Sequence, residues 1–285
     1  MDTTMLTYAE ALREAVSMLL GRSPTPRLDA ELLLAQICGI SRTHLLAEWD
    51  TRLSPEQTEQ FHLAVDRRAA GEPVAYLLGT KEFYGRSFTV DRRVLVPRPE
   101  TELLVEHALR WARGRPGRLQ VADIGTGSGC IAITLALELP LTHIIAADLS
   151  PDALDVARLN VERYALGDRI ALVKGDGLAP LYDKVDLLVS NPPYMTLEQV
   201  DPDVRLWEPQ LALDGRGLDG MELPRRLIER APGYLAASGA LFMEIADWQG
   251  AAALGVAHEV FQRAEVRVYQ DLAGQDRLLA VDTTM

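Results

Sequence analysis

Hydrophobic positions in the first 75 residues recur at helical spacing and are separated by helix start and stop signals. Thr7 and Glu10 form a capping box ahead of an apolar stripe that runs from Leu12 to Leu20 and stops at Gly21. Three further helices are predicted at 28–38, after Ser41, and from Ser54-Pro55 to about Gly71. Residues 1–75 are therefore predicted to form a small helical bundle.

The pattern changes to short runs of strand-forming residues between residues 76 and 99. Lys81–Tyr84 and Ser87–Val90, joined across Gly85-Arg86, predict a β-hairpin. Pro97 and Pro99 follow, and each proline disfavours helical backbone in the residue before it. We therefore predict that residues 76–99 form a β-hairpin linker that enters the next helix in an extended conformation.

Predicted strands and helices alternate from residue 100 to residue 285. Strands are predicted at 119–124, 143–148, 170–174, 185–190, 240–245, 265–270 and 277–281. Helices are predicted at 100–112, 128–138, 151–164, 223–236 and 249–262. Such alternation is typical of an α/β fold with a mostly parallel, doubly wound sheet. The irregular stretch from residue 195 to 222 is long for a loop inside a compact domain, and such loops are often functional.

The fourth predicted strand of this region, 185–190, ends in the turn Asn191-Pro192-Pro193-Tyr194. Neither proline carries a backbone N–H, so local turn hydrogen bonds use fewer of the carbonyl groups. The Asn191 side-chain oxygen and the Pro192 carbonyl can then accept both protons of one planar NH2 group, while Tyr194 offers a flat face to its plane. The pattern indicates chemistry on an amino or amide nitrogen. An ordinary turn that closes a strand is the alternative.

A glycine-rich turn, Gly125-Thr126-Gly127-Ser128-Gly129, joins the strand at 119–124 to the helix that follows. Glycines allow the backbone to approach a ligand closely, and N–H groups at the start of a helix are free to donate. Asp148 ends the next strand, where a carboxylate can accept hydrogen bonds from both hydroxyls of a ribose. Together these features predict a nucleoside cofactor.

The residues around the glycine turn and after the third strand indicate which nucleoside cofactor is bound. The position three residues after Gly127 is Cys130, where a dinucleotide fingerprint has its third glycine. Asp123 would repel a pyrophosphate but can pair, directly or through water, with the ammonium of an amino-acid moiety, so S-adenosylmethionine fits better than NAD. Asp176, which precedes Gly177 after the third strand, is predicted to approach the adenine amino group; a turn aspartate is the alternative.

Composition and charge narrow the class of protein. The 285 residues are 48% hydrophobic and 25% charged, which is ordinary for a soluble globular protein of about two domains. The net charge is −12 and only three lysines occur, which argues against a general nucleic-acid or membrane-surface binder because such binding needs clustered cations. Cys38 and Cys130 lack C-x-x-C spacing, so we expect no metal site and a reduced, cytoplasmic setting. We expect no signal peptide and no membrane span.

These residues together resemble the release-factor glutamine methyltransferases, the HemK/PrmC family. The Pro-Arg-Pro-Glu-Thr-Glu segment and the Asn-Pro-Pro-Tyr turn are specific in combination, although neither is specific alone. The likeness extends over nearly the whole chain and is carried by 73–79, 83–88, 96–102, 125–129, Asp148, 191–194, Glu208-Pro209 with Leu213, Glu244, Gln249 and 271–277.

The resemblance implies a Rossmann-like class I S-adenosylmethionine-dependent methyltransferase domain with a small N-terminal helical domain. It implies methyl transfer to the side-chain amide nitrogen (N5) of the glutamine in the Gly-Gly-Gln loop of class-I peptide chain release factors, with S-adenosylhomocysteine as product. By resemblance, residues 125–129, Asp148 and Asn191 contact the cofactor, and residues 191–194 hold the glutamine. The helical bundle is expected to recognise the protein substrate, and the enzyme is expected to act as a monomer.

Two parts of the family pattern need separate expectations here. Some members carry an aromatic residue, packed against the adenine, at the place that Gly177 occupies in this chain, so Leu178 or a neighbour is expected to replace it. The resemblance also implies that residues 97–102 form part of the active-site wall, where Glu100 or Glu102 could orient Arg98 or the cofactor.

Two other functions remain open from the sequence. The exocyclic amino group of adenine could occupy the same turn, so an adenine-N6 methyltransferase acting on flipped bases of DNA or RNA is one alternative. A non-catalytic binding protein that keeps the cofactor fold is the other.

Overall fold

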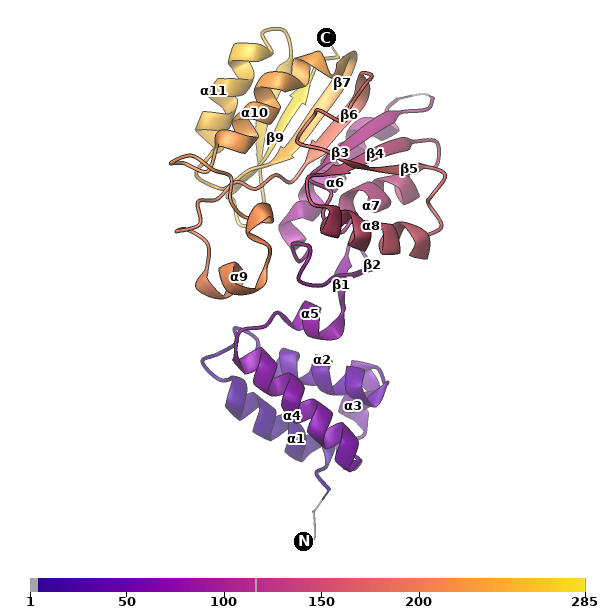
Figure 1. Ribbon diagram of the computed structural model, residues 1–285, viewed down its shortest axis with the longest axis vertical. Coiled ribbons are helices and arrows are strands. Elements are labelled where there is room, and N and C mark those ends of the chain that lie inside the picture. Colours follow the sequence, from indigo (N-terminus) through magenta and orange to yellow (C-terminus); the bar gives the residue numbers. More distant parts are fainter. Residues whose placement is uncertain (1–4, 116, 285) are drawn as a thin grey trace. The chain divides into compact units, whose positions relative to one another are not determined.

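The computed structural model describes residues 5–115 and 117–284, and the chain divides into two compact units (Figure 1). One unit ends at Thr80 and the other begins at Lys81. The helical unit extends past the predicted boundary at residue 75 because a short helix, α5 (Val74–Leu78), continues it to the left-handed cap at Gly79.

The N-terminal unit is built on helices that begin at the predicted capping signals. They are α1 (Tyr8–Leu19), α2 (Pro26–Cys38), α3 (Arg42–Ala47) and α4 (Pro55–Ala69). Both predicted capping boxes form, at Thr7 with Glu10 and at Ser54 with Gln57. The apolar faces enclose a core of their own around Leu34, and no residue of that core belongs to the second unit. Burial of this core stabilises the bundle because apolar surface is removed from water.

The predicted hairpin forms from β1 (Thr80–Phe83) and β2 (Arg86–Thr89). Its turn lies at Tyr84-Gly85, one residue before the predicted position, with φ of +51° and +68°. Positive φ at both central residues gives the twist that a two-residue hairpin requires. Phe83 and Phe88 are buried in a core of the second unit, so most of the predicted linker is an integral part of that unit.

A seven-stranded sheet forms the centre of the second unit. Its strand order is β5-β4-β3-β6-β7-β9-β8, with β3 to β7 parallel and β9 antiparallel to both of its neighbours. The strands are β3 (Gln120–Ile124), β4 (His143–Asp148), β5 (Ile170–Lys174), β6 (Val185–Ser190), β7 (Leu235–Glu244), β8 (Glu265–Gln270) and β9 (Asp276–Asp282). The predicted doubly wound α/β fold is thereby confirmed.

Helices cover both faces of this sheet (Figure 1). One face packs against α6 (Glu102–Arg113), α7 (Cys130–Glu138) and α8 (Pro151–Arg163), and the other against α10 (Glu222–Arg230) and α11 (Gly250–Val260). A short helix, α9 (Pro202–Trp207), lies in the stretch from residue 195 to 222, which is otherwise irregular as predicted apart from a 3-10 turn at Gln210–Ala212. None of the described helices combines the length and the apolar character needed to cross a bilayer.

One predicted boundary is wrong by several residues. The helix predicted at 223–236 ends at Arg230 and is followed by a single 3-10 turn, Ala231–Gly233. Pro232 cannot donate a helical hydrogen bond, so the α-helix does not continue through it. As a result β7 begins at Leu235, earlier than the predicted residue 240, and pairs with β6 from Val185 onward.

Candidate active site

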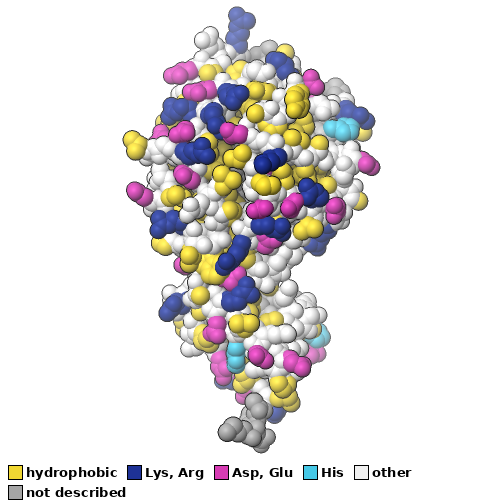
Figure 2. Space-filling view, in the orientation of Figure 1, with side chains coloured by type: hydrophobic (Ala, Val, Ile, Leu, Met, Phe, Trp, Pro, Cys, Tyr) yellow, Lys and Arg dark blue, Asp and Glu magenta, His cyan; other side chains and the backbone are white. Residues whose placement is uncertain are grey.

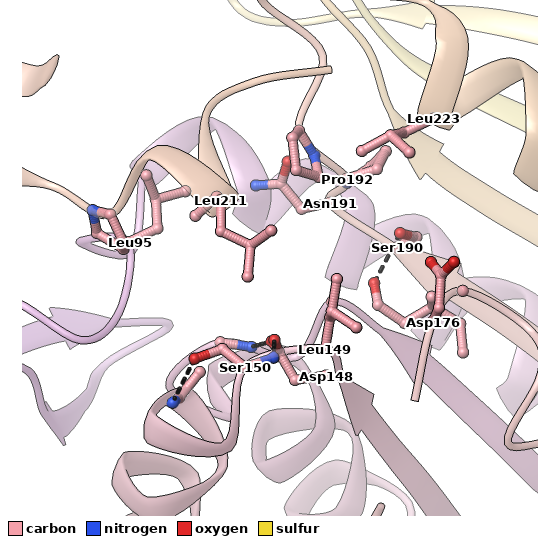
Figure 3. A pocket seen from close by; sticks show the side chains of 18 of the residues that line it. Leu95, Asp148, Leu149, Ser150, Asp176, Ser190, Asn191, Pro192, Leu211 and Leu223 are labelled. Atoms are coloured by element: carbon pink, nitrogen blue, oxygen red, sulfur yellow. Dashed lines mark hydrogen bonds between the residues drawn. The ribbon is translucent and has the colours of Figure 1, made fainter. Parts of the chain in front are cut away.

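The site lies where the order of the parallel strands reverses, between β3 and β6. In doubly wound sheets, ligands bind outside the carboxyl ends of the strands at such a reversal. The Ser190 hydroxyl donates to the Ile124 carbonyl at 2.7 Å and joins the ends of the two strands. A cavity opens at these ends, and its walls come from the loops after β3, β4, β5 and β6 (Figure 3).

The glycine turn after β3 has the backbone conformation that only glycine adopts without strain. Gly125, Gly127 and Gly129 have φ of +75°, +55° and +80°. A Cβ on Gly129 would lie 3.2 Å from Ile133 Cδ1, so this glycine also lets the turn approach α7 and α8 closely. Only Gly125 and Gly127 of the five turn residues line the cavity.

The polar residues of the turn are buried and make hydrogen bonds within the protein. Thr126 and Ser128 are buried. The Thr126 hydroxyl donates to Asp123, and the Ser128 carbonyl accepts a hydrogen bond from the Asn160 amide. Direct cofactor contacts from Thr126, Ser128 and Gly129 therefore stay predictions, since the structure places none of the three in the cavity wall.

Asp148 is held with its carboxylate at the cavity. It accepts hydrogen bonds from the backbone N–H groups of Gly127 and Ser150, both at 2.9 Å. Burial raises the pKa of Asp148, and these N–H donors act in the opposite direction. Asp148 and Asn191 lie on opposite walls of the cavity (Figure 3).

Asp123 lies below the cavity and does not line it. The side chain is fully buried and accepts hydrogen bonds from the Thr126 hydroxyl at 2.7 Å and the Ala132 N–H at 3.1 Å. Burial raises its pKa to about 7. Its second oxygen, Oδ1, is buried and has no hydrogen-bond partner among the described residues. This position favours an indirect contact with a ligand over a direct one.

Asp176 and Gly177 line the cavity after β5, together with Arg226 and Leu227 of α10. Asp176 forms an ion pair with the Arg226 guanidinium. A Cβ on Gly177 would lie 3.6 Å from Leu227 Cδ2 and 3.8 Å from a terminal nitrogen of Arg226, so these two side chains occupy the space beside the glycine. Leu178, which we expected to replace an aromatic residue, is buried in the core and does not line the cavity.

Asn191, Pro192 and Pro193 line the cavity, but Tyr194 does not. The Asn191 amide donates through Nδ2 to the Thr101 hydroxyl at 3.1 Å. Within residues 5–115 and 117–284, no donor reaches Asn191 Oδ1 or the Pro192 carbonyl, so both acceptors are available to a ligand. This is the arrangement that the sequence predicted for binding an NH2 group.

The Tyr194 hydroxyl donates to Glu244 Oε1 at 2.9 Å. Burial, reinforced by Glu244, raises the pKa of Tyr194 far above its usual range. The predicted contact between the Tyr194 ring and a substrate amide stays a prediction.

The backbone of the turn is held by the segment that follows it. Gln249 Nε2 donates to the Tyr194 carbonyl at 2.7 Å. A Cβ on Gly220 would lie 2.3 Å from the same carbonyl, and a Cβ on Gly215 would lie 2.8 Å from the Pro193 carbonyl. Both glycines are therefore required for this loop to pack against the turn.

None of residues 97–102 lines the cavity, whose lining in this part of the chain is Arg93, Val94 and Leu95. Their place in the active-site wall stays a prediction, and Arg98 is held by a residue from another segment. Glu208 binds Arg98 at 2.5 Å and also accepts the Val96 N–H at 2.9 Å. Glu102 accepts the N–H of Tyr84 in the hairpin turn. Arg98 is thus oriented by a buried carboxylate 110 positions away in the sequence and not by Glu100 or Glu102. Orientation of the cofactor by either of these glutamates stays a prediction.

Several cavity residues carry no motif and were not predicted. Leu149 follows Asp148 directly, so its position next to the ribose-type acid was the one available signal. The others come from loops and from α10, and no local pattern marks them. They include Arg93, Val94, Leu95, Ser150, Leu211, Arg216, Leu223, Arg226 and Leu227.

Comparison with known proteins places the chain in a family. Residues 10–79 match the PrmC N-terminal domain, and residues 99–207 match the methyltransferase small domain. A release factor glutamine methyltransferase from Moorella thermoacetica is 44% identical over 95% of this chain and 97% of its own. One from Bacillus subtilis is 39% identical over 96% of this chain and 97% of its own.

Among solved structures, a methyltransferase from Pyrococcus furiosus shares the fold of most of this chain. It superposes with a TM-score of 0.54 at 18% identity, over 72% of this chain and 92% of its own. With two relatives aligned over almost their full length, the chain belongs to the release factor glutamine methyltransferase family.

Proposed function

We propose that this enzyme transfers a methyl group from S-adenosylmethionine to N5 of the glutamine in the Gly-Gly-Gln loop of class-I peptide chain release factors, and so modulates translation termination. The observation that carries the proposal is the pair of available acceptors, Asn191 Oδ1 and the Pro192 carbonyl, on the cavity wall opposite Asp148. Family membership supports the same substrate.

The residues of the cavity fit S-adenosylmethionine. Asp148 presents a carboxylate already oriented by two backbone donors, which suits a ribose diol. Gly125 and Gly127 line the cavity and have no side chains, so the amino-acid moiety could contact their backbone directly. Asp123 does not line the cavity and would interact with this moiety indirectly. Leu149, Leu227 and Arg226 would flank the adenine in place of an aromatic side chain at Gly177. When bound, S-adenosylmethionine supplies an electrophilic methyl group.

The chain's own contribution is positioning and desolvation. A primary amide nitrogen is a poor nucleophile because its lone pair is delocalised into the carbonyl group. Asn191 Oδ1 and the Pro192 carbonyl would accept its two protons and orient its plane, while the prolines and Leu211 exclude water. Fixed orientation of this kind lowers the barrier mainly through entropy that is lost on binding and not in the reaction.

The surface of the protein favours a protein substrate over a nucleic acid. On the face shown in Figure 2, basic and acidic side chains are interspersed over both units, without one continuous basic area. The net charge of −12 agrees with this distribution. Binding of a phosphate backbone depends on clustered cations, so these observations weigh against the adenine-N6 alternative.

The N-terminal unit is the part of the chain that we assign to recognition of the release factor. It has its own core and contributes no residue to the cavity lining. Release factors act in translation, so the enzyme would encounter them in the cytoplasm. We propose that it acts there as a monomer.

Mass spectrometry of a release factor incubated with the enzyme and S-adenosylmethionine tests the function. One added methyl group, located on the glutamine of the Gly-Gly-Gln loop, is the expected result. A release factor with that glutamine changed to asparagine should stay unmodified. Labelled methyl appearing in DNA or RNA, and none in the release factor, would reject the proposal in favour of the alternative.

A further inference from the structure

Three arginines line the cavity, and they differ in whether their charge is paired. Arg93 forms an ion pair with Asp91. Arg226 forms one with Asp176. The guanidinium of Arg216 is exposed and has neither an ion pair nor a hydrogen bond with any residue that the structure describes. Its N–H donors are therefore available to a ligand in the cavity.

The backbone at Arg216 has a conformation that glycine adopts without strain and other residues rarely adopt. Its φ is +62°, and its neighbours are Gly215 and Gly217. The other described non-glycine residues with positive φ are Tyr84, in the hairpin turn, and Ala165, just after the end of α8. Left-handed residues are common in such places, whereas Arg216 closes neither a hairpin nor a helix. The position favours glycine on conformational grounds, so the arginine points to a role of its side chain.

The loop that carries Arg216 packs against the Asn-Pro-Pro-Tyr turn. The Gly215 N–H donates to the Met195 carbonyl at 2.8 Å. A Cβ on Gly215 would lie 2.8 Å from the Pro193 carbonyl oxygen, so the two backbone segments are in close contact. The Arg216 N–H donates to Asp214 Oδ1 at 2.9 Å, which fixes its backbone. Arg216 is thus held beside the turn that would bind the substrate amide, although its side chain has no partner among the described residues.

Arg216 and Arg226 belong to different parts of the cavity lining. Arg226 lies beside Gly177, after β5, where we place the adenine. The backbone next to Arg216 instead contacts the turn after β6. The unpaired guanidinium therefore belongs to the part of the lining that we assign to the substrate.

The chemistry of a Gly-Gly-Gln segment suits an unpaired guanidinium. Glycine has no side chain, so two glycines offer only backbone N–H and C=O groups to a binding site. A guanidinium has five N–H donors in a fixed planar arrangement and accepts no hydrogen bond. Asn191 Oδ1 and the Pro192 carbonyl provide acceptors for the glutamine NH2 group. Arg216 provides the donors that the backbone carbonyl groups require.

We propose that Arg216 is a specificity-determining residue, whose guanidinium donates to the backbone carbonyl groups of the two glycines that precede the methylated glutamine. This contact holds the tripeptide while the amide occupies the acceptor pair. It favours a Gly-Gly-Gln loop over other glutamine-bearing segments, because larger side chains at the glycine positions would keep the guanidinium away from the backbone. The proposal rests on the function proposed above, since it names the part of the substrate that Arg216 recognises.

Arg216→Gly is the central variant, because it removes the side chain and supplies the residue that the backbone favours. We expect KM for the release factor to rise about tenfold or more, since hydrogen bonds from a charged group are lost. The kcat should change less than about threefold, and the Kd of S-adenosylhomocysteine less than about twofold. Relief of left-handed strain offsets the greater freedom of glycine in the unfolded chain, so Tm should stay within about 3 °C of the wild type. A loss of recognition is then not a loss of folding.

Two control variants separate the contact from the change in backbone and from the change in charge. Ala165→Gly makes the same backbone change at an exposed left-handed residue outside the cavity lining. Arg225→Ala removes a positive charge that pairs with Asp219 and does not line the cavity. Neither should change KM for the release factor by more than about twofold. A control that raises KM as much as Arg216→Gly does overturns the proposal.

A cycle between enzyme and substrate tests the contact with the glycines. A release factor with the glycine immediately before the glutamine changed to valine should be methylated less efficiently by the wild type, because the added side chain obstructs the carbonyl contact. For Arg216→Gly, the same change in the substrate should lower kcat/KM by a factor that is about threefold smaller or less still, because the contact is already absent. Equal factors for the two enzymes overturn the proposal.

A second readout does not depend on turnover. Calorimetric binding of the unmodified release factor to the enzyme saturated with S-adenosylhomocysteine should be weaker for Arg216→Gly by about the same factor as KM rises. Unchanged affinity and unchanged KM overturn the proposal. Weaker binding of S-adenosylhomocysteine with an unchanged KM for the release factor also overturns it, because Arg216 would then bind the carboxylate of the cofactor. Failure of the wild type to methylate any class-I release factor rejects the proposed function instead.

Discussion

The backbone N–H of Gly127 donates to the carboxylate of Asp148 at 2.9 Å, so the turn after β3 and the acid at the end of β4 hold each other in place. Asp148→Ala should weaken binding of S-adenosylhomocysteine by about 10- to 100-fold, because hydrogen bonds to a charged group contribute about 1.5–3 kcal/mol. Isothermal titration calorimetry measures this directly. Asp152→Asn, an exposed acid in the first turn of α8, should bind as the wild type does. Equal affinities for Asp148→Ala and the wild type would remove Asp148 from the ribose site.

Asn191→Ala should affect turnover far more than cofactor binding. The variant loses the acceptor that orients the substrate amide, so we expect kcat to fall by about 10²-fold or more. The Kd of S-adenosylhomocysteine should change less than about threefold, since Asp148 and the glycine turn are untouched. Single-turnover kinetics together with calorimetry separate the two effects. A variant that turns over normally but binds the cofactor weakly would contradict the assigned role.

Because of Asp123, the free energy of unfolding should decrease as the pH rises towards 7. Burial raises its pKa to about 7 from an ordinary value of 3.8, so between these two pH values the folded state binds more protons than the unfolded state. Stability from this group is therefore present at low pH, declines as pH rises towards about 7, and is constant above it. This contribution of Asp123 to the free energy of unfolding is on the order of 4 kcal/mol, because a difference of one in pKa corresponds to about 1.36 kcal/mol.

Urea unfolding of the wild type and Asp123→Asn at several pH values between 5 and 8 measures this contribution. The stability of the wild type relative to the variant should decrease across that range. A difference that does not change with pH would show that Asp123 is ionised throughout.

Arg226→Ala should weaken cofactor binding although no sequence motif marks this residue. Its guanidinium is held by Asp176 beside Gly177, where it can lie against a planar base. A cation against an aromatic ring contributes about 0.5–2 kcal/mol, so Kd should rise about 2- to 30-fold. Arg225→Ala is the matched control, because Arg225 pairs with Asp219 and does not line the cavity. Equal effects of the two substitutions on Kd would count against an adenine site at Gly177.

Removing residues 1–80 should separate substrate recognition from cofactor binding. The unit that begins at Lys81 keeps its own cores and the whole cavity lining. The truncated enzyme should bind S-adenosylhomocysteine within about twofold of the full chain, while KM for the release factor rises about tenfold or more. An unchanged KM would show that the N-terminal unit does not contribute to recognition.

Local patterns in the sequence were sufficient to predict most helices, the order of strands along the chain and the cavity edge. Capping boxes and the glycine turn act over a few residues, so their geometry is encoded where they occur. The strands that precede Gly125 and Asn191 and the strand that ends at Asp148 meet at one edge because parallel strands in such a sheet share a direction.

Contacts between distant segments could not be predicted in this way. Thr101 and Asn191 are 90 positions apart, and their contact depends on the packing of α6 and the register of β6. The same is true of Arg98 with Glu208 and of Arg226 with Asp176. Each is a polar residue without a local periodic signal, so its partner becomes evident only in the folded structure.

Because β9 lies between β7 and β8, loss of the C-terminal residues would disrupt this end of the sheet. β8 pairs with β9, which follows it in the sequence, and no other described strand adjoins it. A chain cut before Asp276 would therefore leave β8 without a neighbour and expose the edge of β7 along Leu241, Phe242 and Met243. Apolar strand edges of this kind attract the same edge on other molecules. Such fragments should precipitate or be degraded, and would not persist as partly active enzyme.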